Sequence, residues 1–195
     1  KGVLWWSSTH RDHHRYSDKK EDPHSPIQKG FWWSHIGWIF SEQHMDTACH
    51  RIKDMAKFPE LRWLDKYWIV PYILLFLATY FLLGTQYLVW GCFVAVFLCM
   101  HATFCINSIT HLFGKKTYKT SDESRNIFWL GVVTFGEGFH CNHHYYSASV
   151  RQGFRWYEFD ISYYILCILE KLNIVWNLHR PSDKIINDPN KMLKN

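Results

Sequence analysis

The chain has 195 residues and a formal net charge of +5, and 48% of its residues are hydrophobic and 18% aromatic, with 11 Trp. This composition excludes an intrinsically disordered chain, and the length suits one domain. The basic residues are interspersed with acidic and aromatic ones and match no nucleic-acid-binding motif, so we interpret them as loop and membrane-facing charges and expect no nucleic-acid partner.

The chain starts at Lys1 instead of Met, so we expect a piece of a longer protein. Its polar N-terminal part carries the pattern H-x-x-H-H, in which His10, His13 and His14 stand at positions i, i+3 and i+4. On a helix these positions share one face, so the pattern points three imidazoles in one direction. Neutral imidazole is a good ligand for transition metals.

The middle of the chain, residues 67–114, contains no Asp, Glu, Lys or Arg. One spanning helix needs about 20 residues, so this stretch predicts two spans, at 67–83 and 87–106, with a break at 84–86. Two buried helices of a soluble protein are the alternative. Basic residues flank both ends of the stretch, which predicts that both flanks face the cytoplasm. The basic residues concerned are Lys53, Lys57, Arg62, Lys66, Lys115, Lys116 and Lys119.

Two aromatic stretches have the composition of segments that lie on a membrane surface. Residues 31–40 hold several Trp and Phe, and we interpret them as an amphipathic helix at the headgroup level. Residues 159–176 show apolar positions at helical spacing with few charges, and we interpret them as interfacial because they are too charged for a third span.

A second H-x-x-H-H pattern, formed by His140, His143 and His144, follows the apolar middle, and His111 stands just after the second span. Because two spans return the chain to the side it left, both triplets and His111 are expected on one membrane face. Seven imidazoles exceed what one metal usually takes, so the pattern predicts a two-metal site. Iron suits this setting, and spacing leaves zinc and copper open.

These residues carry a family resemblance. The segment from His10 to Trp38, the run Asn107–Gly114 and the run Gly136–His144 resemble the second and third histidine-box regions of membrane fatty-acid desaturases of the delta-9 type, the stearoyl-CoA and acyl-lipid desaturases. The match extends from about Trp5 to Trp176. The tail 151–158 is more similar to bacterial members than to animal ones.

The resemblance implies an oxidoreductase that uses two non-haem iron ions and O2 to place a cis double bond, at the delta-9 position, into a long-chain acyl thioester or acyl lipid. It implies electrons from a cytochrome b5-like protein or from a ferredoxin with its reductase, and contact with membrane lipid. The implied iron ligands are His10, His13, His14, His111, His140, His143 and His144, with Asn107 holding a metal-bound water. Trp6, Thr103 and Phe104 match positions that line the kink of the acyl tunnel.

The expected fold is an all-α membrane protein: a transmembrane hairpin with a cytosolic, histidine-rich helical cap, or half of a four-span desaturase fold. We expect a cytosolic segment at 1–66, the two spans at 67–106 and the cap at 107–195. The expected location is a membrane with the site on its cytosolic face, the bacterial inner membrane or, in a eukaryote, the endoplasmic reticulum. The family's first box, H-x-x-x-x-H, is missing from this chain, so two of the implied ligands are absent.

Other polar residues near the boxes have hypothesised supporting roles. Asp12 and Glu137 are expected to orient imidazoles by hydrogen bonding, and His24 and His35 to support the ligands from outside. His101 lies inside the second span, where an ionisable group is expensive, so it is expected to line the tunnel or to bond a neighbouring carbonyl.

Two other functions use part of this pattern. A membrane di-iron hydroxylase or alkane oxygenase would use the same histidines and yield an alcohol instead of an alkene. A membrane metal-binding or transport protein is the non-enzyme alternative. It would need ligands inside the spans, where only His101 lies.

Overall fold

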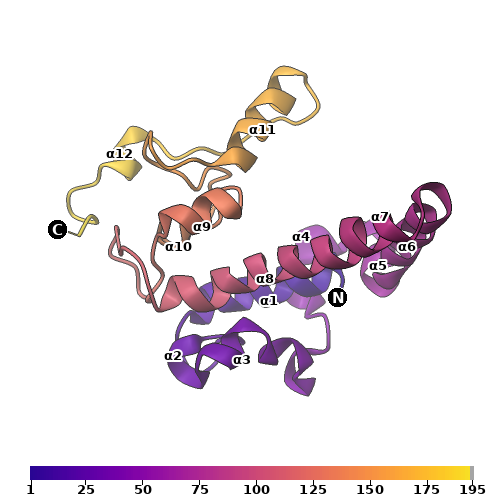
Figure 1. Cartoon of the computed structure of the whole chain (residues 1–195). Coiled ribbons are helices and arrows are strands. Elements are labelled where there is room, and N and C mark those ends of the chain that lie inside the picture. Colours follow the sequence, from indigo (N-terminus) through magenta and orange to yellow (C-terminus); the bar gives the residue numbers. More distant parts are fainter. Residues whose placement is uncertain (194–195) are drawn as a thin grey trace.

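The computed structural model describes residues 1–193, and within that range it is built of helices and turns, without a sheet strand. The expectation of an all-α fold is met for this part of the chain. A central body carries two projecting arms (Figure 1). The helices that organise the body and the arms are α1 (Val3–Tyr16), α6 (Ile69–Leu83), α8 (Ala95–Ser108), α10 (His140–Tyr145) and α11 (Ile161–Lys171).

Helix α1 is held at its N-terminal end by α5 (Pro59–Lys66). The carboxylate of Asp65 accepts a hydrogen bond of 2.8 Å from the backbone N–H of Trp5. A carboxylate at this place satisfies one of the free amides of the first turn and interacts favourably with the helix dipole. The Trp5 ring also stacks on Trp38 at 5.5 Å. The start of the helix that carries the first histidine triplet is therefore fixed on two sides.

Short helices fill the segment between α1 and the apolar arm: α2 (Pro26–Lys29), α3 (Phe31–His35), η1 (Gly37–Phe40), η2 (Glu42–His44), η3 (Cys49–Arg51), α4 (Lys53–Ala56) and α5. The expectation of one amphipathic helix over residues 31–40 is wrong, because the helix breaks at Ile36, where φ is −144°. Helix α3 packs against α8 and buries Ser34 and His35, whereas Trp32 stays exposed. Packing against α8 decides which side of this stretch is covered.

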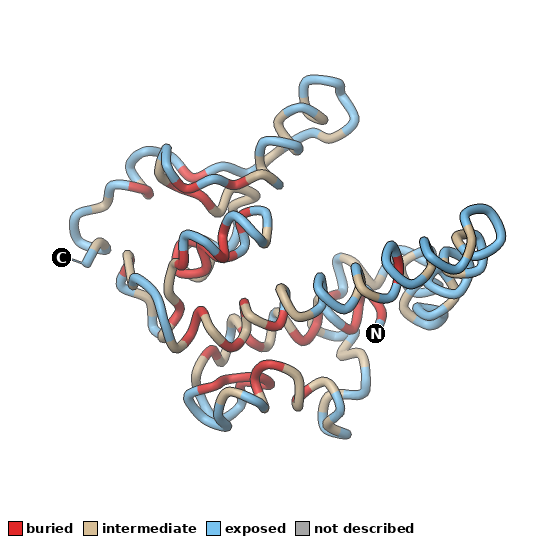
Figure 2. Tube along the Cα trace, viewed as in Figure 1, coloured by how far each residue is buried: buried red, intermediate tan, exposed pale blue. Residues whose placement is uncertain are grey.

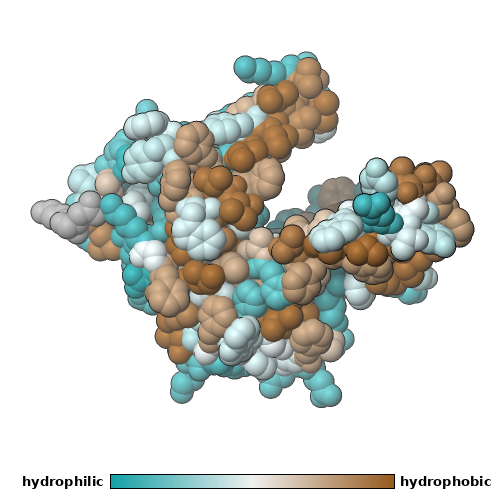
Figure 3. Space-filling model, in the orientation of Figure 1, coloured by the Kyte–Doolittle hydropathy of each residue, from teal (hydrophilic) through white to brown (hydrophobic). Residues whose placement is uncertain are grey.

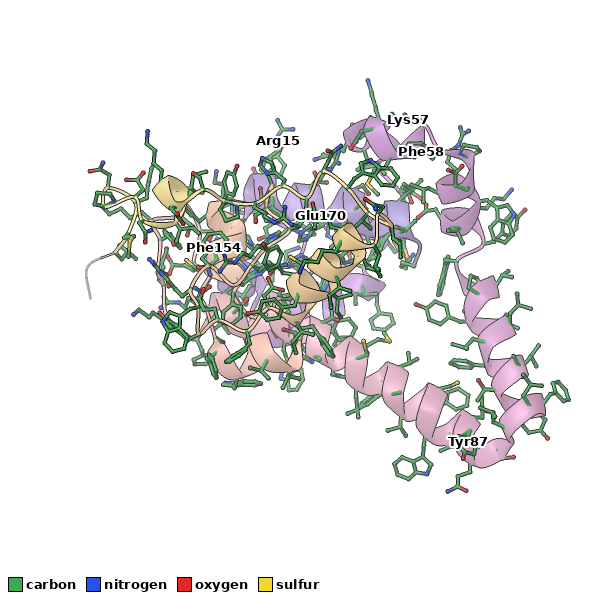
Figure 4. The ribbon with its side chains drawn as sticks, turned by 90° about the horizontal axis from the view of Figure 1, so that it is seen from above. Arg15, Lys57, Phe58, Tyr87, Phe154 and Glu170 are labelled. Carbon is green, nitrogen blue, oxygen red and sulfur yellow. The ribbon has the colours of Figure 1, made fainter. Side chains whose placement is uncertain are left out.

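The apolar middle of the chain forms one arm. Helix α6 ends at Gly84, whose φ of +90° favours glycine, and the chain turns back through α7 (Thr85–Tyr87) and the π-helical turn η4 (Leu88–Val94) into α8 and η5 (Ile109–His111). The two legs meet at the tip that carries Tyr87 (Figure 4). The rings of Phe76 in α6 and Phe93 in η4 lie 4.9 Å apart and join the two legs.

One helix, Thr85–His111, is long and apolar enough to cross a membrane, and the pair Pro59–Lys66 and Ile69–Leu83, bent by 69°, is a second candidate if it counts as one span. The continuous helix extends beyond the expected end at residue 106 and includes His111. Large apolar side chains on the arm are exposed, among them Phe81 at 76% and Leu82 at 80%, and much of the arm's visible surface is apolar (Figure 3). Exposed apolar surface of this extent favours contact with lipid or with other apolar helices.

The C-terminal part contains α9 (Phe128–Val133), α10, α11 and α12 (Asp183–Ile186). A small core of Tyr118, Cys141, Phe154 and Ile186 packs around α10. The segment before α10 runs close to α9. A Cβ atom added to Gly138 would lie only 2.2 Å from the backbone nitrogen of Gly131 in α9. Buried residues concentrate in the central body and are sparse along both arms (Figure 2).

Candidate metal centre

The seven histidines singled out from the sequence lie together in the central body. Helix α1 and helix α10 each present one triplet from a single face, as the i, i+3, i+4 spacing requires, and η5 presents one imidazole at the end of the α8 helix. They form two groups whose ligand nitrogens lie within 4.8 Å of one another: His13, His111, His140 and His144, and His10, His14 and His143.

The first group, called the first cluster below, is almost completely buried. The Nε2 atom of His144 lies 3.3 Å from Nε2 of His13 and 3.0 Å from Nε2 of His140. The His111 ring lies 5.1 to 5.2 Å from the rings of its three partners. Four imidazoles from α1, η5 and α10 therefore converge on one point.

The second group, called the second cluster below, lies directly beside the first. The Nε2 atom of His14 is 2.8 Å from that of His143 and 3.1 Å from that of His10. The ring of His14 is also 4.4 Å from the ring of His144 in the first cluster. Two adjacent groups of imidazole nitrogens fit the two-metal hypothesis better than a single site does.

Three aspartates hold imidazoles of the first cluster from behind. The carboxylates of Asp22, Asp18 and Asp122 accept hydrogen bonds from Nδ1 of His13, His111 and His144, at 3.0, 2.9 and 2.9 Å respectively. A carboxylate at Nδ1 keeps the proton on that nitrogen, fixes the ring orientation and leaves Nε2 with a free lone pair.

This arrangement fits a bound cation. The Nε2 atoms of His13 and His144 face each other with their lone pairs, because the protons of both rings are on Nδ1. Such a pair repels unless a cation accepts both lone pairs. The Nε2 atom of His111 is also buried and has no hydrogen-bond partner within residues 1–193. Neutral imidazole donors suit iron, zinc, copper and nickel.

The protonation states agree with a ligand role. Burial, together with the neighbouring His144, lowers the pKa of His10 to about 4 and that of His143 to about 3. Burial alone would raise the pKa of Asp122, but hydrogen bonds from His144 and Ser124 outweigh it and hold this pKa well below its usual range. Near neutral pH the site thus offers neutral imidazoles and an ionised carboxylate.

A small cavity adjoins the clusters on the side of α8, and a larger one shares part of its lining. A cavity of about 90 Å³ is lined by His10 and His143 of the second cluster and by Trp6, Thr103 and Asn107. The latter three residues also line a second cavity of about 450 Å³, which Phe104 and other apolar side chains border. The structure thus brings the expected tunnel residues and Asn107 to the place where an apolar space meets the imidazoles.

The family model of the fatty acid desaturases matches residues 2–166, which include both triplets and His111. The chain belongs to the fatty acid desaturase family. An sn-1 stearoyl-lipid 9-desaturase of Anabaena variabilis is 41% identical over 179 residues, which cover 91% of this chain and 65% of that protein.

Plant desaturases are similar as well. The delta-9 acyl-lipid desaturase 2 of Arabidopsis thaliana is 38% identical over 91% of this chain and 59% of its own length. A palmitoyl-monogalactosyldiacylglycerol delta-7 desaturase of the same plant is 35% identical over 91% of this chain and 48% of its own length. The chain therefore spans roughly half to two thirds of these desaturases.

Sequence reasoning missed the aspartates that hold the imidazoles. It chose Asp12, which instead pairs with Arg51, and Glu137, which lines the smaller cavity and whose pKa is raised by burial and by nearby Asp160. Asp18 and Asp22 could have been found from the sequence, because they follow the first triplet closely in the chain. The chain turns back there through a residue with a positive φ, Asp18 itself at 60°.

The other histidines with expected roles, His24, His35 and His101, contact either the first cluster or one another. His24 stacks on His13 at 4.1 Å, and its backbone N–H donates to Asp22, so it packs behind the first cluster as hypothesised. His101 pairs with the ring of His35 at 3.0 Å between nitrogens, and within residues 1–193 it makes no hydrogen bond to a carbonyl oxygen.

Proposed function

We propose that this chain carries the greater part of the active site of a membrane fatty-acid desaturase, which places a cis double bond at the delta-9 position of a long acyl chain with O2 as co-substrate. The observation that carries this proposal is the pair of imidazole clusters, in which His13, His111 and His144 have Nε2 free to bind, next to a small cavity that shares its lining with an apolar one. Membership of the desaturase family supports it.

The clusters are proposed to hold two iron ions. The first cluster would contribute four imidazoles to one ion and the second cluster three to the other, with the Asn107 amide orienting a water at the second. Two iron ions bound there would supply the redox chemistry that activates O2 for removal of hydrogen from two adjacent methylenes. The aspartates behind the first cluster keep the protons on Nδ1, so that Nε2 stays free to bind.

The acyl chain is proposed to lie in the apolar cavity and to bend at its junction with the smaller one. Trp6 and Thr103 border both spaces and would form the kink, and Phe104 would close the wall of the larger one. Holding the chain in one bent conformation places two methylenes beside the second cluster. Positioning of this kind accounts for a large part of enzymatic rate enhancement.

The arm is proposed to be a transmembrane hairpin, with residues 1–66 and 107–195 forming the cap on the cytosolic side. The basic residues at both flanks and the uncharged tip support this orientation. Both clusters then lie at the cytosolic membrane face. In the full-length protein, a Cys replacing Thr85 should react with an impermeant reagent from outside, whereas a Cys replacing Ser121 should stay protected.

An acyl lipid is the proposed substrate, since several relatives are named for acyl-lipid or stearoyl-lipid substrates. One relative is named an acyl-CoA desaturase, so an acyl thioester is the second candidate. A cytochrome b5-like protein or a ferredoxin with its reductase is the proposed electron donor. The metal-transport alternative is less well supported. It would need ligands inside the spans, and the imidazole of His101 pairs there with His35.

The proposal is tested by expressing the full-length protein in a desaturase-deficient host and analysing the fatty acids and the purified protein's metal. A new cis alkene and about two irons per chain are expected. An alcohol as the main product would support the hydroxylase alternative instead. Zinc without iron, together with no unsaturated product, would contradict the proposal.

A further inference from the structure

Helix α3 is hydrogen-bonded to the last turns of α8 through two neighbouring residues. The hydroxyl of Ser34 donates to the carbonyl oxygen of Asn107 at 3.0 Å. The Nδ1 atom of His35 lies 3.0 Å from the hydroxyl oxygen of Ser108. Both serines are fully buried. Two consecutive residues of α3 therefore bond two consecutive residues of α8 where water does not reach.

The direction of these hydrogen bonds follows from counting protons. The only hydroxyl proton of Ser108 goes to the carbonyl of Phe104, at 2.9 Å. Ser108 must then accept from Nδ1–H of His35, which leaves Nε2 of a neutral His35 as an acceptor. That Nε2 lies 3.0 Å from Nδ1 of His101, which must donate. One directed series of hydrogen bonds thus runs from His101 of α8 through His35 of α3 and back to Ser108 of α8.

Aromatic rings flank this series of hydrogen bonds. Phe31 stacks on His35 at 5.3 Å, Phe104 stands edge-on to both imidazoles at 5.6 Å, and Phe97 lies 4.4 Å from His101. Ser108 is fully buried, so its hydroxyl would have no substitute for the His35 imidazole, and that bond is costly to break. The α3 contact therefore holds α8 in one rotation and one height.

The held turns of α8 are those that border the cavities. Thr103 and Asn107 line both spaces and Phe104 lines the larger one. The second cluster stands on α1 and α10, and not on α8. The placement of α8 relative to α1 and α10 thus decides which part of a bound acyl chain lies beside the second cluster.

We propose that His35 is a positioning residue that determines the position of the new double bond, by fixing the height of Thr103, Phe104 and Asn107 against the second cluster. This inference rests on the proposed desaturase function. A helix rises about 1.5 Å per residue, close to the advance of one methylene, so a small slip of α8 presents a neighbouring pair of methylenes.

The test uses variants of the full-length protein that lose one or both of the hydrogen bonds made by the His35 side chain. In His35→Asn the amide nitrogen stands near the place of Nδ1 and can still donate to Ser108. In His35→Gln the longer amide reaches towards His101 instead. His35→Ala loses both bonds, and His101→Ala loses only the outer one. His179→Gln changes an exposed histidine far from α3 and serves as the matched control.

The double-bond positions of the products and the iron content of each purified variant are measured. In His35→Ala and His35→Gln, the ratio of the main positional isomer to its neighbours should fall about 10-fold or more with iron content unchanged. His35→Asn and His101→Ala both lose only the bond between His35 and His101, so their ratios should fall equally little, and the control should keep the wild-type ratio. If His35→Ala does not fold, the contrast between the Asn and Gln variants carries the test.

An unchanged isomer ratio in His35→Gln, at wild-type iron content, would overturn the inference and leave the proposed function standing. A parallel loss of iron and product in the Asn and Gln variants, without a change in isomer ratio, would show a purely structural role and would also overturn it. If the wild-type protein forms no alkene at all, the proposed function fails, and the inference fails with it.

Discussion

Both clusters consist of imidazoles, but different neighbouring groups hold the rings in place. In the first cluster, His13, His111 and His144 each have an aspartate behind Nδ1, and His13 and His111 are each 1% exposed. In the second cluster, His10 is supported by a stacked ring, that of Trp6 at 4.5 Å. The Nδ1 atom of His143 is buried without a hydrogen-bond partner among the described residues.

This difference separates a rigid site from an adaptable one. Charged hydrogen bonds at Nδ1 fix ring orientation and raise the basicity of Nε2, whereas stacking leaves a ring freer to rotate. Two imidazoles of the second cluster, His10 and His143, border the smaller cavity, whereas the first cluster reaches it only through His140. We therefore interpret the first cluster as the firmly held part of the centre and the second as the part that adjusts next to the substrate.

The largest expected effect comes from removing an imidazole of the first cluster. His144→Ala should lower both iron content and desaturation about 100-fold or more, because His144 joins its own cluster to His14. His143→Ala should instead retain about one iron per chain. Iron analysis and product analysis of the full-length variants measure this, with His179→Ala as the control. Equal iron loss in both variants would contradict the comparison.

A smaller effect is expected from removing a carboxylate. Asp122→Ala should weaken iron binding about 10- to 100-fold, because His144 loses the acceptor that fixes its ring. Asp122→Asn should lose less, since its amide oxygen can still accept from Nδ1. Iron titration of the metal-free variants measures the change. Asp12→Ala, whose carboxylate pairs with Arg51, is the matched control, and an equal loss in it would refute the role of Asp122.

The smallest expected effect concerns the stacked ring. A chelator should remove iron in two phases, with the second cluster emptied first. Trp6→Ala should speed the fast phase about 2- to 10-fold, the equivalent of about 0.5–1.5 kcal/mol of aromatic stacking, and leave the slow phase unchanged. His143→Ala should lack the fast phase, which identifies it. A single phase in the wild-type protein would argue against two differently held ions.

Local patterns were enough to predict several features. The i, i+3, i+4 spacing of His10, His13 and His14 predicts a shared face whatever the helix packs against, and α1 has that face. The run without charges predicts two spans. Within the described residues the helix Thr85–His111 is long enough for one, whereas Ile69–Leu83 qualifies only together with the bent segment Pro59–Lys66. Helical periodicity and hydropathy depend on neighbours in the chain, so they can be read without the fold.

The sequence by itself thus determined which residue types were available and which helix faces they occupy. The tertiary structure alone decided how the seven histidines divide into groups of four and three, and which aspartates hold them. Asp18 and His111 are 93 positions apart and still bond at 2.9 Å. It also decided that residues 31–40 break into two short helices and that His35 meets His101. Such contacts depend on how α1, α3, α8 and α10 pack, and no local periodicity encodes that packing.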